Sequence, residues 1–445
     1  MLRRRYGTFV GGLDLPDEKQ ETLSRPVRAA FVPQRLHVPL AYGPGPQAAP
    51  RVSRGQYVSA GDMLAEGSPP DSVHVLAPMS GLVSAFTTAD VAAGGRFVTV
   101  DAVEMTALQP AQPPQTPFGP IDWRRAPANM LSDRLAEGAL TTCSHPVRPL
   151  AAWLAEARQA NVALLVVSGM EDEPYVTSDH RTLAEHGEDV LFALALLARI
   201  IGASETAMVV DERRTGDYAH VMAPAEAHGV HLIALPYKYP TGAEPILLKI
   251  LTGLEVPIGR TSFHIGAAVI SPATALAVAR WALRGRPTLT RILTLAGHQI
   301  IHPVNIPVPF GTPCAELSQI THAPLTHGGP MKGLNCTPRA VVTPATNAVL
   351  ALAAPEPVSP CPCIRCGWCT DHCPARLNVS LLNDALELAD LPTARRAGAM
   401  ACVDCGVCSY VCPSRLPLTY RVAQLKRAIA GRRQLARSSA AEPAS

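Results

Sequence analysis

Nine of the 12 cysteines in this 445-residue chain lie between Cys361 and Cys412, and eight of them repeat one pattern. In this pattern three cysteines are spaced by two residues each, and a fourth follows three residues later, directly before a proline. The two copies are Cys363-x2-Cys366-x2-Cys369-x3-Cys373-Pro374 and Cys402-x2-Cys405-x2-Cys408-x3-Cys412-Pro413. Three thiolates at this spacing hold three irons of a [4Fe–4S] cube, and the fourth binds the other cube.

The spacing therefore predicts two clusters with crossed ligand sets. The predicted sets are Cys363, Cys366, Cys369 and Cys412 for one cluster, and Cys402, Cys405, Cys408 and Cys373 for the other. Gly367 and Gly406 are small enough for the loop backbone to turn its N–H groups toward the sulfurs. A zinc site needs only four ligands, and a disulfide framework needs an oxidising compartment, so both are disfavoured. Cys361 is predicted to be a bystander.

Composition limits the remaining function classes. The formal charge is +3, from 39 Lys and Arg against 36 Asp and Glu, which is too balanced for a nucleic-acid binder. The longest apolar run, from residue 190 to 198, stops at Arg199 and falls short of the roughly 18 residues that span a bilayer. The basic N-terminus has no apolar region after it, as a signal peptide would. We expect a soluble cytoplasmic protein, and no nucleic-acid partner.

The chain is expected to fold as several domains, beginning with a strand-rich domain over residues 1–118. Residues 58–65 and 74–83 resemble the two halves of a barrel-sandwich hairpin of the biotinyl or lipoyl carrier type. Such a carrier needs a lysine at an exposed hairpin tip, but no lysine lies between Lys19 and Lys238. Covalent biotin and lipoate are therefore excluded, and the domain is expected to be structural or a docking surface.

Residues 119–286 are expected to form a Rossmann-like α/β domain. Short apolar runs at residues 163–167, 207–210 and 231–235 read as buried strands, and residues 190–201 read as a buried helix. The β-α-β-α-β order predicts an open, largely parallel sheet. Ligands of such sheets bind at the carboxyl ends of the strands, where an acidic segment at residues 168–175 follows the first strand.

Three further regions complete the predicted organisation. Two expected strands, at residues 287–297 and 306–310, predict a small β-grasp module over residues 287–345. Residues 346–425 carry the cysteine motifs, and a helical pattern between the motifs (residues 381–401) predicts a helical dicluster ferredoxin domain. The remaining residues 426–445 are basic and then rich in Ser and Ala, and are expected to be disordered.

Segments along most of the chain, with the double cysteine motif, resemble the C subunit of the Rnf ion-translocating ferredoxin:NAD⁺ oxidoreductase. More distant resemblances are to the cobalamin reductase of propanediol-utilising microcompartments and to the flavin subunit of respiratory complex I. The matching segments are 9–19, 169–181, 238–253, 311–313 and 328–331. The order, with the hairpin sandwich first and the cysteine motifs last, is closer to the Rnf subunit than to the cobalamin reductase.

The resemblance implies that the α/β domain binds FMN and accepts hydride from NADH, and that the clusters carry single electrons onward. A flavin is needed between them because it can exchange either two electrons or one. The implied cofactor-contacting residues are Glu171, Glu173 and Tyr175 at the flavin and nicotinamide pocket, and Lys238, Gly242 and Glu244 near the flavin edge or phosphate. The implied partners are other subunits of a membrane-bound electron transport complex, on the inner face of the membrane, and ferredoxin or NADH.

The sequence departs from that family at the loop expected to bind the FMN phosphate. The family has a glycine-rich loop ending in a lysine before the first strand of the α/β domain, whose backbone N–H groups cradle the phosphate. The corresponding residues 137–150 keep only Gly138 and have no lysine. In the acidic segment, Ser168 replaces the usual asparagine and Asp172 the usual cysteine. Arg148 remains as one cation in this loop.

Three functions stay open on the sequence alone. The chain could be an electron-input subunit that exchanges electrons with NADH or ferredoxin through a flavin and two clusters. It could be a flavin-free relay or scaffold that only conducts electrons between partners. It could also be a cobalamin reductase, which would again need a flavin. The larger set of matching motifs favours electron transfer in an Rnf-type complex, with direct NADH oxidation left open.

Overall fold

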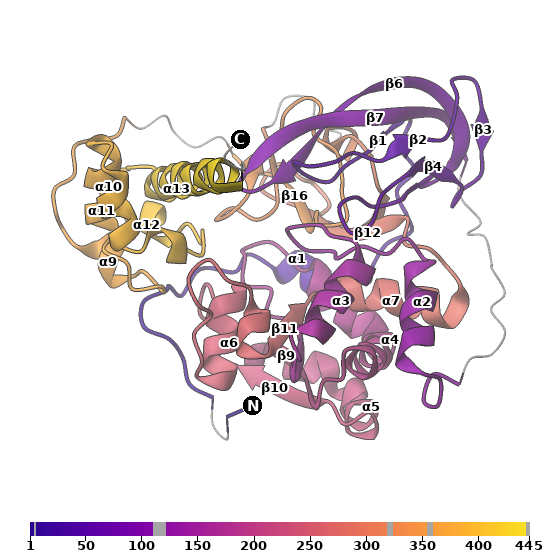
Figure 1. Ribbon diagram of the computed structural model, residues 1–445, viewed down its shortest axis with the longest axis horizontal. Coiled ribbons are helices and arrows are strands. Elements are labelled where there is room, and N and C mark those ends of the chain that lie inside the picture. The colour runs from indigo at the N-terminus through magenta and orange to yellow at the C-terminus, as the bar shows by residue number, and fades with distance from the viewer. Residues whose placement is uncertain (4–5, 110–121, 318–323, 354–358, 442–445) are drawn as a thin grey trace. The chain divides into compact units, whose positions relative to one another are not determined.

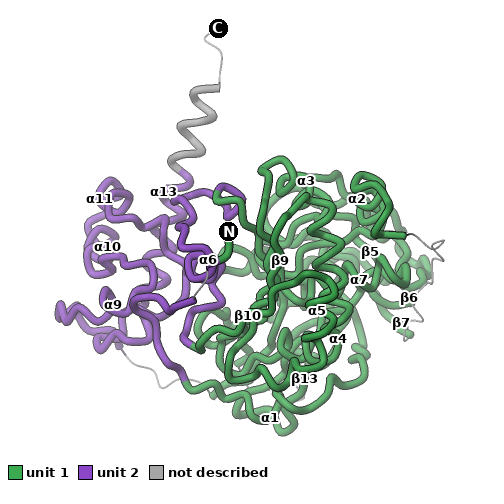
Figure 2. Tube along the Cα trace, turned by 90° about the horizontal axis from the view of Figure 1, so that it is seen from below, with its two compact units in different colours: residues 1–2, 16–237, 265–354 green, residues 3–15, 238–264, 355–445 purple. Residues whose placement is uncertain are grey.

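The computed structural model describes residues 1–3, 6–109, 122–317, 324–353 and 359–441, and for residues 432–441 it describes the backbone only (Figure 1). The chain divides into two compact units, which Figure 2 colours separately. Unit 1 comprises residues 1–2, 16–237 and 265–354, and unit 2 comprises residues 3–15, 238–264 and 355–445. The cysteine motifs thus share unit 2 with two segments from distant parts of the sequence.

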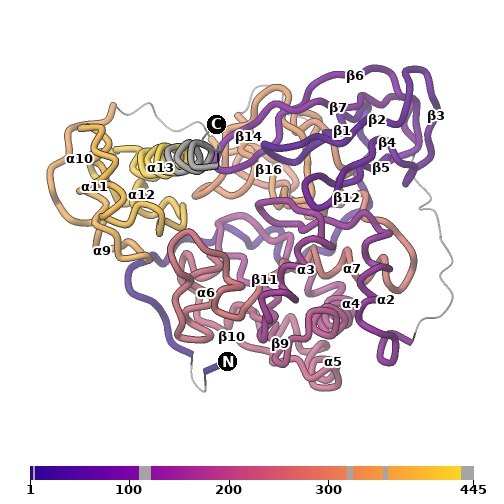
Figure 3. The backbone as a smooth tube through the Cα atoms, viewed as in Figure 1, coloured from indigo at the N-terminus to yellow at the C-terminus, as the bar shows by residue number. Residues whose placement is uncertain are grey.

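The first part of unit 1 is built from two small antiparallel sheets. One sheet has the order β1-β7-β6-β3 and the other β2-β4-β5. Their strands are β1 (Leu36–Pro39), β2 (Ala49–Pro50), β3 (Tyr57–Val58), β4 (Met63–Glu66), β5 (Val75–Leu76), β6 (Ser80–Ala93) and β7 (Arg96–Gln109). Strands β6 and β7 form a long hairpin (Figure 3), which turns at Gly94 and Gly95, both with positive φ as tight hairpin turns require. The core between the sheets is apolar and includes Leu64, Val83 and Met105.

The predicted open α/β sheet is confirmed. All its neighbouring strands are parallel, in the order β10-β9-β8-β11. The strands are β8 (Leu164–Ser168), β9 (Glu205–Asp211), β10 (His231–Leu235) and β11 (Ala267–Ile270). The sequence missed β11, because its four residues are too few to show a period. Since β9 and β10 lie on one side of β8 and β11 on the other, the strand order reverses between β8 and β11, where such folds bind ligands.

Helices of unit 1 pack around this sheet (Figure 1). They are α2 (Ala128–Ala136), α3 (Leu150–Gln159), α4 (Ser178–Ile201), α5 (Met222–Ala227) and α7 (Pro272–Arg284), with a 3-10 helix at Glu212–Val221. Helix α4 contains the predicted helix and extends it toward the N-terminus, up to the acidic segment. Helix α7 begins directly after β11, and its first turn is capped by the side chain of Ser271.

A mixed five-stranded sheet completes unit 1, in the order β13-β12-β16-β14-β15. Its strands are β12 (Thr290–Ala296), β13 (Val304–Pro309), β14 (Leu325–His327), β15 (Leu334–Asn335) and β16 (Ala348–Ala351), and the short helix α8 (Cys314–Leu317) follows β13. Strands β12 and β13 confirm the two predicted strands. Strand β16 lies beyond the predicted limit at residue 345, and it is fully buried between β12 and β14. The short helix α1 (Gln20–Leu23) also belongs to unit 1.

Unit 2 is helical around the cysteine motifs, as predicted. Its helices are α6 (Glu244–Thr252), α9 (Trp368–Asp371), α10 (Val379–Glu387), α11 (Leu391–Arg396), α12 (Val407–Tyr410) and α13 (Leu418–Ala441). The prediction of a disordered tail is wrong for residues 426–441, which belong to α13, and residues 442–445 lie outside the described residues. Val422, Leu425 and Ile429 bury one side of this helix in the core of unit 2, at the spacing of a helix face. Among the described residues no helix combines the length and the apolar character that crossing a bilayer requires.

Candidate functional site

The first hollow of unit 2 is lined by four thiols taken from both cysteine motifs. These thiols belong to Cys363, Cys366, Cys369 and Cys412. The loop of the first motif turns at Gly367, whose φ of +85° lies in the region that favours glycine and starts helix α9. The four thiols are the first set that the spacing predicted to act together.

The second hollow gathers the other four thiols. They belong to Cys373, Cys402, Cys405 and Cys408. Its loop turns at Gly406 with a φ of +83°, matching Gly367 in the first motif, and starts helix α12. Cys361 lines neither hollow, and its backbone N–H donates to the Ser414 carbonyl over 3.0 Å. The crossed arrangement expected from the spacing therefore appears in the geometry of the thiols.

The thiols surround a space rather than meeting at a point. Within the described ranges, no three His, Cys, Asp or Glu side chains come close enough together to bind a single metal ion. A zinc site needs such convergence, whereas a cube keeps its four thiolates apart on separate irons. Burial raises the pKa of the Cys369 and Cys408 thiols, so iron would supply the positive charge that stabilises their thiolates. The donor set fits an iron–sulfur cube at each hollow.

Backbone and hydroxyl groups point at some of these sulfurs. The N–H group of Leu377 donates to the Cys373 sulfur and that of Asp404 to the Cys402 sulfur, each at a distance of 3.4 Å. The Thr419 hydroxyl lies 3.4 Å from the Cys408 sulfur. Hydrogen bonds to cluster sulfurs are one of the factors that set the reduction potential. All three of these sulfurs belong to the second hollow.

Two segments remote in sequence support the cysteine loops within unit 2. The Gly12 N–H donates to the His372 carbonyl over 2.8 Å, and a side chain at Gly11 would come within 2.8 Å of the Cys373 carbonyl oxygen. The hydroxyl of the fully buried Tyr239 donates to the Cys405 carbonyl over 2.6 Å. Residues 11–12 and Tyr239, from two motifs far apart in the sequence, thus contact the cysteine loops, which the sequence could not show.

The three residues predicted near the flavin edge belong to this part of unit 2. The Lys238 ammonium donates to the Phe9 carbonyl over 2.7 Å and lies 4.8 Å from the centre of the Phe9 ring. Gly242 follows in the same segment, and Glu244 opens helix α6 and accepts a hydrogen bond from Ser262. Lys238 therefore holds the 9–12 segment, which in turn contacts the cysteine loops.

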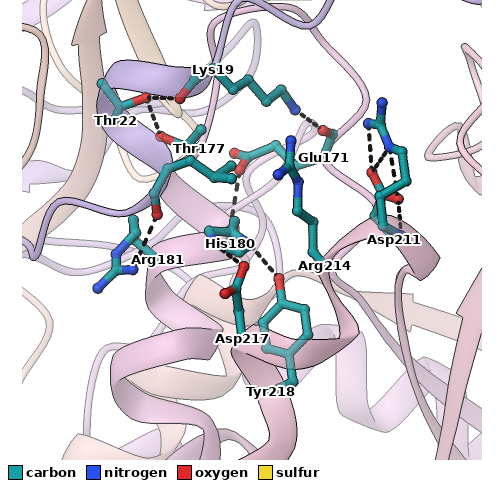
Figure 4. Close-up of polar contacts among 12 residues, drawn as sticks. Lys19, Thr22, Glu171, Thr177, His180, Arg181, Asp211, Arg214, Asp217 and Tyr218 are labelled. Carbon is teal, nitrogen blue, oxygen red and sulfur yellow. Dashed lines mark hydrogen bonds and ion pairs between the residues drawn. The ribbon is translucent and has the colours of Figure 1, made fainter.

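The predicted pocket residue Glu171 serves a different purpose in unit 1, where it caps helix α4. Its carboxylate accepts hydrogen bonds from the Ser178 hydroxyl over 3.0 Å and from the backbone N–H groups of Asp179 and His180 over 3.1 and 3.2 Å. The N-terminus of a helix is a natural anion site, and here the chain fills it with its own carboxylate. The buried Lys19 ammonium donates to the Glu171 backbone carbonyl (Figure 4).

A buried histidine lies next to this cap. The His180 Nδ1 atom is 2.5 Å from the Tyr218 hydroxyl, and its Nε2 atom is 3.5 Å from the Asp217 carboxylate (Figure 4). Burial lowers the pKa of His180 to about 4, so the ring is neutral at pH 7. His180 is thus a core histidine. Tyr218 gave no signal in the sequence, because a single tyrosine in a polar segment has no pattern.

The other two residues of the acidic segment are also engaged inside unit 1. The Glu173 carboxylate accepts from the Met331 N–H over 2.9 Å and lies 3.9 Å from the Lys332 ammonium. A side chain at Gly329 would overlap that carboxylate, so the motif at residues 328–331 is shaped around Glu173. Tyr175 has a φ of +67°, and its hydroxyl lies 3.1 Å from His298 Nε2.

The loop that corresponds to the family's phosphate-binding loop is closed on itself. The N–H of Thr142 donates to the Arg148 carbonyl, and the N–H of Leu150 donates to the Leu140 carbonyl, each at a distance of 2.9 Å. The Cys143 N–H donates over 2.8 Å to the hydroxyl of Thr274, in the first turn of α7. This hairpin therefore covers the start of α7, at the reversal of strand order. Burial raises the pKa of the Cys143 thiol to about 11, so it stays protonated.

The remaining glycine and cation of this loop are also used internally. A side chain at Gly138 would come within 2.7 Å of the Trp281 ring, so this glycine allows close packing of the loop on α7. Arg148 forms an ion pair with Glu156 of α3. The N–H groups of Thr142, Cys143, Arg148 and Leu150 and the Arg148 cation are therefore taken up inside unit 1, and this part of the loop does not fit the phosphate of FMN.

Three family models match the chain, each on a different part. A model described as the RnfC barrel sandwich hybrid domain matches residues 7–106, and one described as a 4Fe-4S dicluster domain matches residues 358–414. A model described as the Nuo51 FMN-binding domain matches residues 147–280. This third match begins at Val147, so most of the closed hairpin lies outside it.

Relatives extend these matches along most of the chain. The chain is 31% identical over 395 residues to the C subunit of the ion-translocating oxidoreductase complex of Edwardsiella ictaluri, covering 85% of this chain and 48% of that protein. It is 30% identical over 411 residues to the protein of the same name from Rhodobacter capsulatus, covering 88% and 77%. The fold and the thiol sites define an iron–sulfur protein with a barrel-sandwich domain and an α/β domain of the FMN-binding type. The chain belongs to the family formed by the C subunits of ion-translocating oxidoreductase complexes.

The chain covers only part of the length of these relatives, and its similarity to solved structures is low. The chain spans about half the length of the Edwardsiella ictaluri relative, and about three quarters of the Rhodobacter capsulatus one. A solved structure titled as NAD+-reducing [NiFe]-hydrogenase in the H2-reduced state is similar to this chain with a TM-score of 0.45 and 14% identity. That similarity covers 72% of this chain and 66% of the other.

Proposed function

We propose that the chain is an electron-transfer subunit of an Rnf-type ion-translocating oxidoreductase and passes single electrons through two [4Fe–4S] clusters. The observation that carries this proposal is the pair of hollows, each lined by four thiols drawn from both cysteine motifs. The clusters, when bound, supply one-electron redox chemistry. Family membership supports the setting, because the relatives are subunits of an ion-translocating oxidoreductase complex by name.

The residues of unit 2 have three roles in this proposal. Eight cysteines bind the clusters in the crossed sets given above. The N–H groups of Leu377 and Asp404 and the Thr419 hydroxyl adjust the second cluster's potential through its sulfurs. Tyr239 and Gly12 fix the loops that carry Cys405 and Cys373, so the thiols are held in place before the cluster binds.

A flavin-free relay is the form of this function that the closed hairpin favours. Because residues 137–150 do not offer a phosphate cradle, and Glu171 fills the N-terminus of α4, hydride chemistry is assigned to a partner. Glu173 and Tyr175 then stabilise unit 1, and Lys238, Gly242 and Glu244 support the segment that holds the cysteine loops. A cobalamin reductase would need a flavin in this chain, and is therefore disfavoured.

The relatives also guide the proposals on partners, location and domains. We assign as partners the other subunits of the membrane-bound complex and a one-electron carrier such as ferredoxin, with the chain held at the inner face of the membrane. The sheets and helices support domain limits near residues 36–109, 122–286, 287–353 and 359–441, with residues 238–264 belonging to the compact unit of the fourth domain. These limits differ from the sequence-based ones mainly at the fourth domain, which extends through α13, and at the third, which includes β16.

Anaerobic reconstitution with iron and sulfide tests the proposal. The full chain should bind about eight irons and eight sulfides, since each cube contains four of each. After reduction by dithionite, its electron paramagnetic resonance spectrum at low temperature should show two interacting one-electron centres. A chain that binds about one metal ion, or none, and shows no such signal would contradict the proposal.

A further inference from the structure

The loops of the two cysteine motifs have the same pattern, but they differ in exposure. The loop at residues 363–369 carries Trp368, whose side chain is 54% exposed. The equivalent position in the loop at residues 402–408 is Val407, which is 0% exposed. Each residue follows the glycine that turns its loop. The two loops therefore share their cysteine spacing but differ in the residue after the glycine and in its exposure.

The same contrast holds for the second cysteine of each loop and for the residue after the first cysteine, which is exposed at Ile364 and half-buried at Val403. Cys366 is exposed, whereas its counterpart Cys405 is buried and accepts the Tyr239 hydrogen bond at its carbonyl. Ile364 is 66% exposed, and it lines the first hollow beside Cys366. One wall of the first hollow thus reaches the surface, with two large apolar side chains on either side of an exposed thiol. Large apolar side chains grouped at a surface mark interaction sites.

The charge of this region is positive. Residues 359–431 contain eight Lys and Arg against five Asp and Glu. Four of the five acids are engaged inside the region, as ion pairs or as a helix cap: Asp384 with Arg365, Glu387 with Arg421, Asp404 with Lys426, and Asp390 at the first turn of α11. The fifth, Asp371, is exposed at the end of α9. The exposed arginines include Arg376, Arg395, Arg396 and Arg415. Arg415 adjoins Ser414 and Leu416, which both line the first hollow.

We propose that the loop at residues 363–369 is the docking surface for an acidic protein that carries its own one-electron redox centre. Trp368 and Ile364 form its apolar centre, and the net positive charge of residues 359–431, with Arg415 next to the first hollow, attracts the partner electrostatically. One electron passes between the partner's centre and the first cluster, so one is oxidised and the other reduced, with no bond or proton transferred. The second cluster is then the internal one. This inference depends on the proposed electron transfer.

Binding and electron transfer can be measured separately with a probe of known charge. We suggest oxidised plant-type ferredoxin, an acidic one-electron protein, and oxidised cytochrome c as a basic one. Binding of each to the reconstituted full chain is measured by isothermal titration calorimetry at low ionic strength, where no electrons move. The rate of reduction by reduced ferredoxin is then measured by stopped flow, and divided by the rate with dithionite for the same preparation.

The decisive variant is Trp368→Ser, because Trp368 is exposed and does not line the hollow. Its matched control is Leu388→Ser. Leu388 is also a large apolar residue, and it is 78% exposed at the end of α10. We expect Trp368→Ser to weaken ferredoxin binding at least tenfold and to lower the rate ratio by a similar factor. Leu388→Ser should stay within twofold of the unaltered chain. Arg415→Gln should reduce the dependence of binding on salt concentration.

Several results would overturn the docking surface. The first is that Trp368→Ser binds ferredoxin as tightly as the unaltered chain does. The second is that the unaltered chain does not bind ferredoxin, and the third is that it binds cytochrome c more tightly than ferredoxin. Binding to phosphatidylglycerol vesicles that is lost in Trp368→Ser and blocks ferredoxin would assign the loop to a lipid surface instead. Failure of dithionite to reduce the reconstituted chain would refute the proposed electron transfer, while the calorimetry would still decide where the acidic protein binds.

Discussion

The hairpin at residues 140–150 and the two cysteine loops correspond to the parts of the family where redox cofactors are expected. They differ in what their cofactor-binding groups contact. In the cysteine loops, eight thiols face two inner spaces. In the hairpin, the N–H groups of Thr142, Cys143 and Leu150 are turned toward other groups of unit 1. A site made of backbone donors can therefore close without loss of the fold, because each N–H readily finds another acceptor.

Thiols behave differently, since a buried thiol gains little from its neighbours and needs iron to hold its negative charge. Their side chains are kept around a space by glycine turns and by the segments at residues 9–12 and 238–244. An electron-transfer protein of this kind can thus keep its one-electron centres and lose its two-electron centre. The contrast between the retained thiol sites and the closed hairpin is open to direct tests.

The largest effect is expected from removing one thiol of the internal hollow. Cys405→Ser should lower the iron content from about eight toward about four per chain, because a [4Fe–4S] cube needs its four ligands. Electron transfer onward from the first cluster should be abolished, while the first cluster should still accept an electron from a partner. Iron analysis and electron paramagnetic resonance measure this, with Cys361→Ser as the control, since Cys361 lines neither hollow. Equal loss of iron in both variants would contradict the crossed ligand sets.

Gly138→Ala tests whether the hairpin glycine now serves packing alone. The new methyl group would come within 2.7 Å of the Trp281 ring, and overpacking of this kind costs up to about 3 kcal/mol. The free energy of unfolding should fall while dithionite reduces the clusters as before. The control is Gly216→Ala, where a methyl group meets nothing within 4 Å. If Gly138→Ala were as stable as Gly216→Ala, the glycine would not be needed for packing.

Acid should destabilise unit 1 through its buried neutral histidines. Burial lowers the pKa of His180 and of His327 to about 4, below the value of about 6.5 in an unfolded chain. Their stabilising contribution is present above pH 6.5 and is lost as pH falls toward 4. Because each histidine binds a proton more readily in the unfolded chain, lowering the pH from 7 to 5 should reduce the free energy of unfolding by roughly 2 kcal/mol per histidine.

The pH dependence is measured by chemical denaturation of the full chain at both pH values. His180→Asn should reduce the pH-dependent loss by roughly 2 kcal/mol. The exposed His302 provides a control, since His302→Asn should leave the slope as it is in the unaltered chain. A slope unchanged by His180→Asn would contradict the burial of a neutral ring at this position.

Glu173→Ala should have the smallest effect and no consequence for electron transfer. It removes the acceptor of the Met331 N–H, and the loss of one such hydrogen bond costs about 1 kcal/mol. The electron-transfer rate per bound cluster should equal that of Glu188→Ala, which removes an exposed glutamate of α4. A large loss of rate with Glu173→Ala alone would place this carboxylate at a working cofactor site.

The sequence predicted those features that depend on short stretches of chain. The thiol sets follow from spacings of two and three residues, and β8, β9, β10 and the buried half of α4 follow from continuous apolar runs. Contacts between distant segments could not be predicted in this way. The hydrogen bond from Tyr239 to Cys405 joins residues 166 positions apart, and nothing local in either segment indicates the other.

The acidic segment shows a second limit of sequence reasoning. A carboxylate next to a helix start has the same sequence signature whether it binds a cofactor or caps the helix, and Glu171 caps α4. The loop at residues 137–150 keeps only Gly138, which predicted an altered cofactor site, and the altered site stays a prediction. The pairing of Thr142 with Arg148 that closes this loop needed the structure, because it depends on three-dimensional hydrogen bonding.

The most direct test of the account is an anaerobic titration of the reconstituted full chain with NADH in the presence of added FMN, followed by dithionite. The absorbance of the clusters in the visible range reports their reduction. The account predicts no bleaching with NADH and FMN, and full bleaching with dithionite, as expected for two competent clusters without a hydride site. Bleaching that requires both NADH and FMN would contradict it, and would show a working flavin site in this chain.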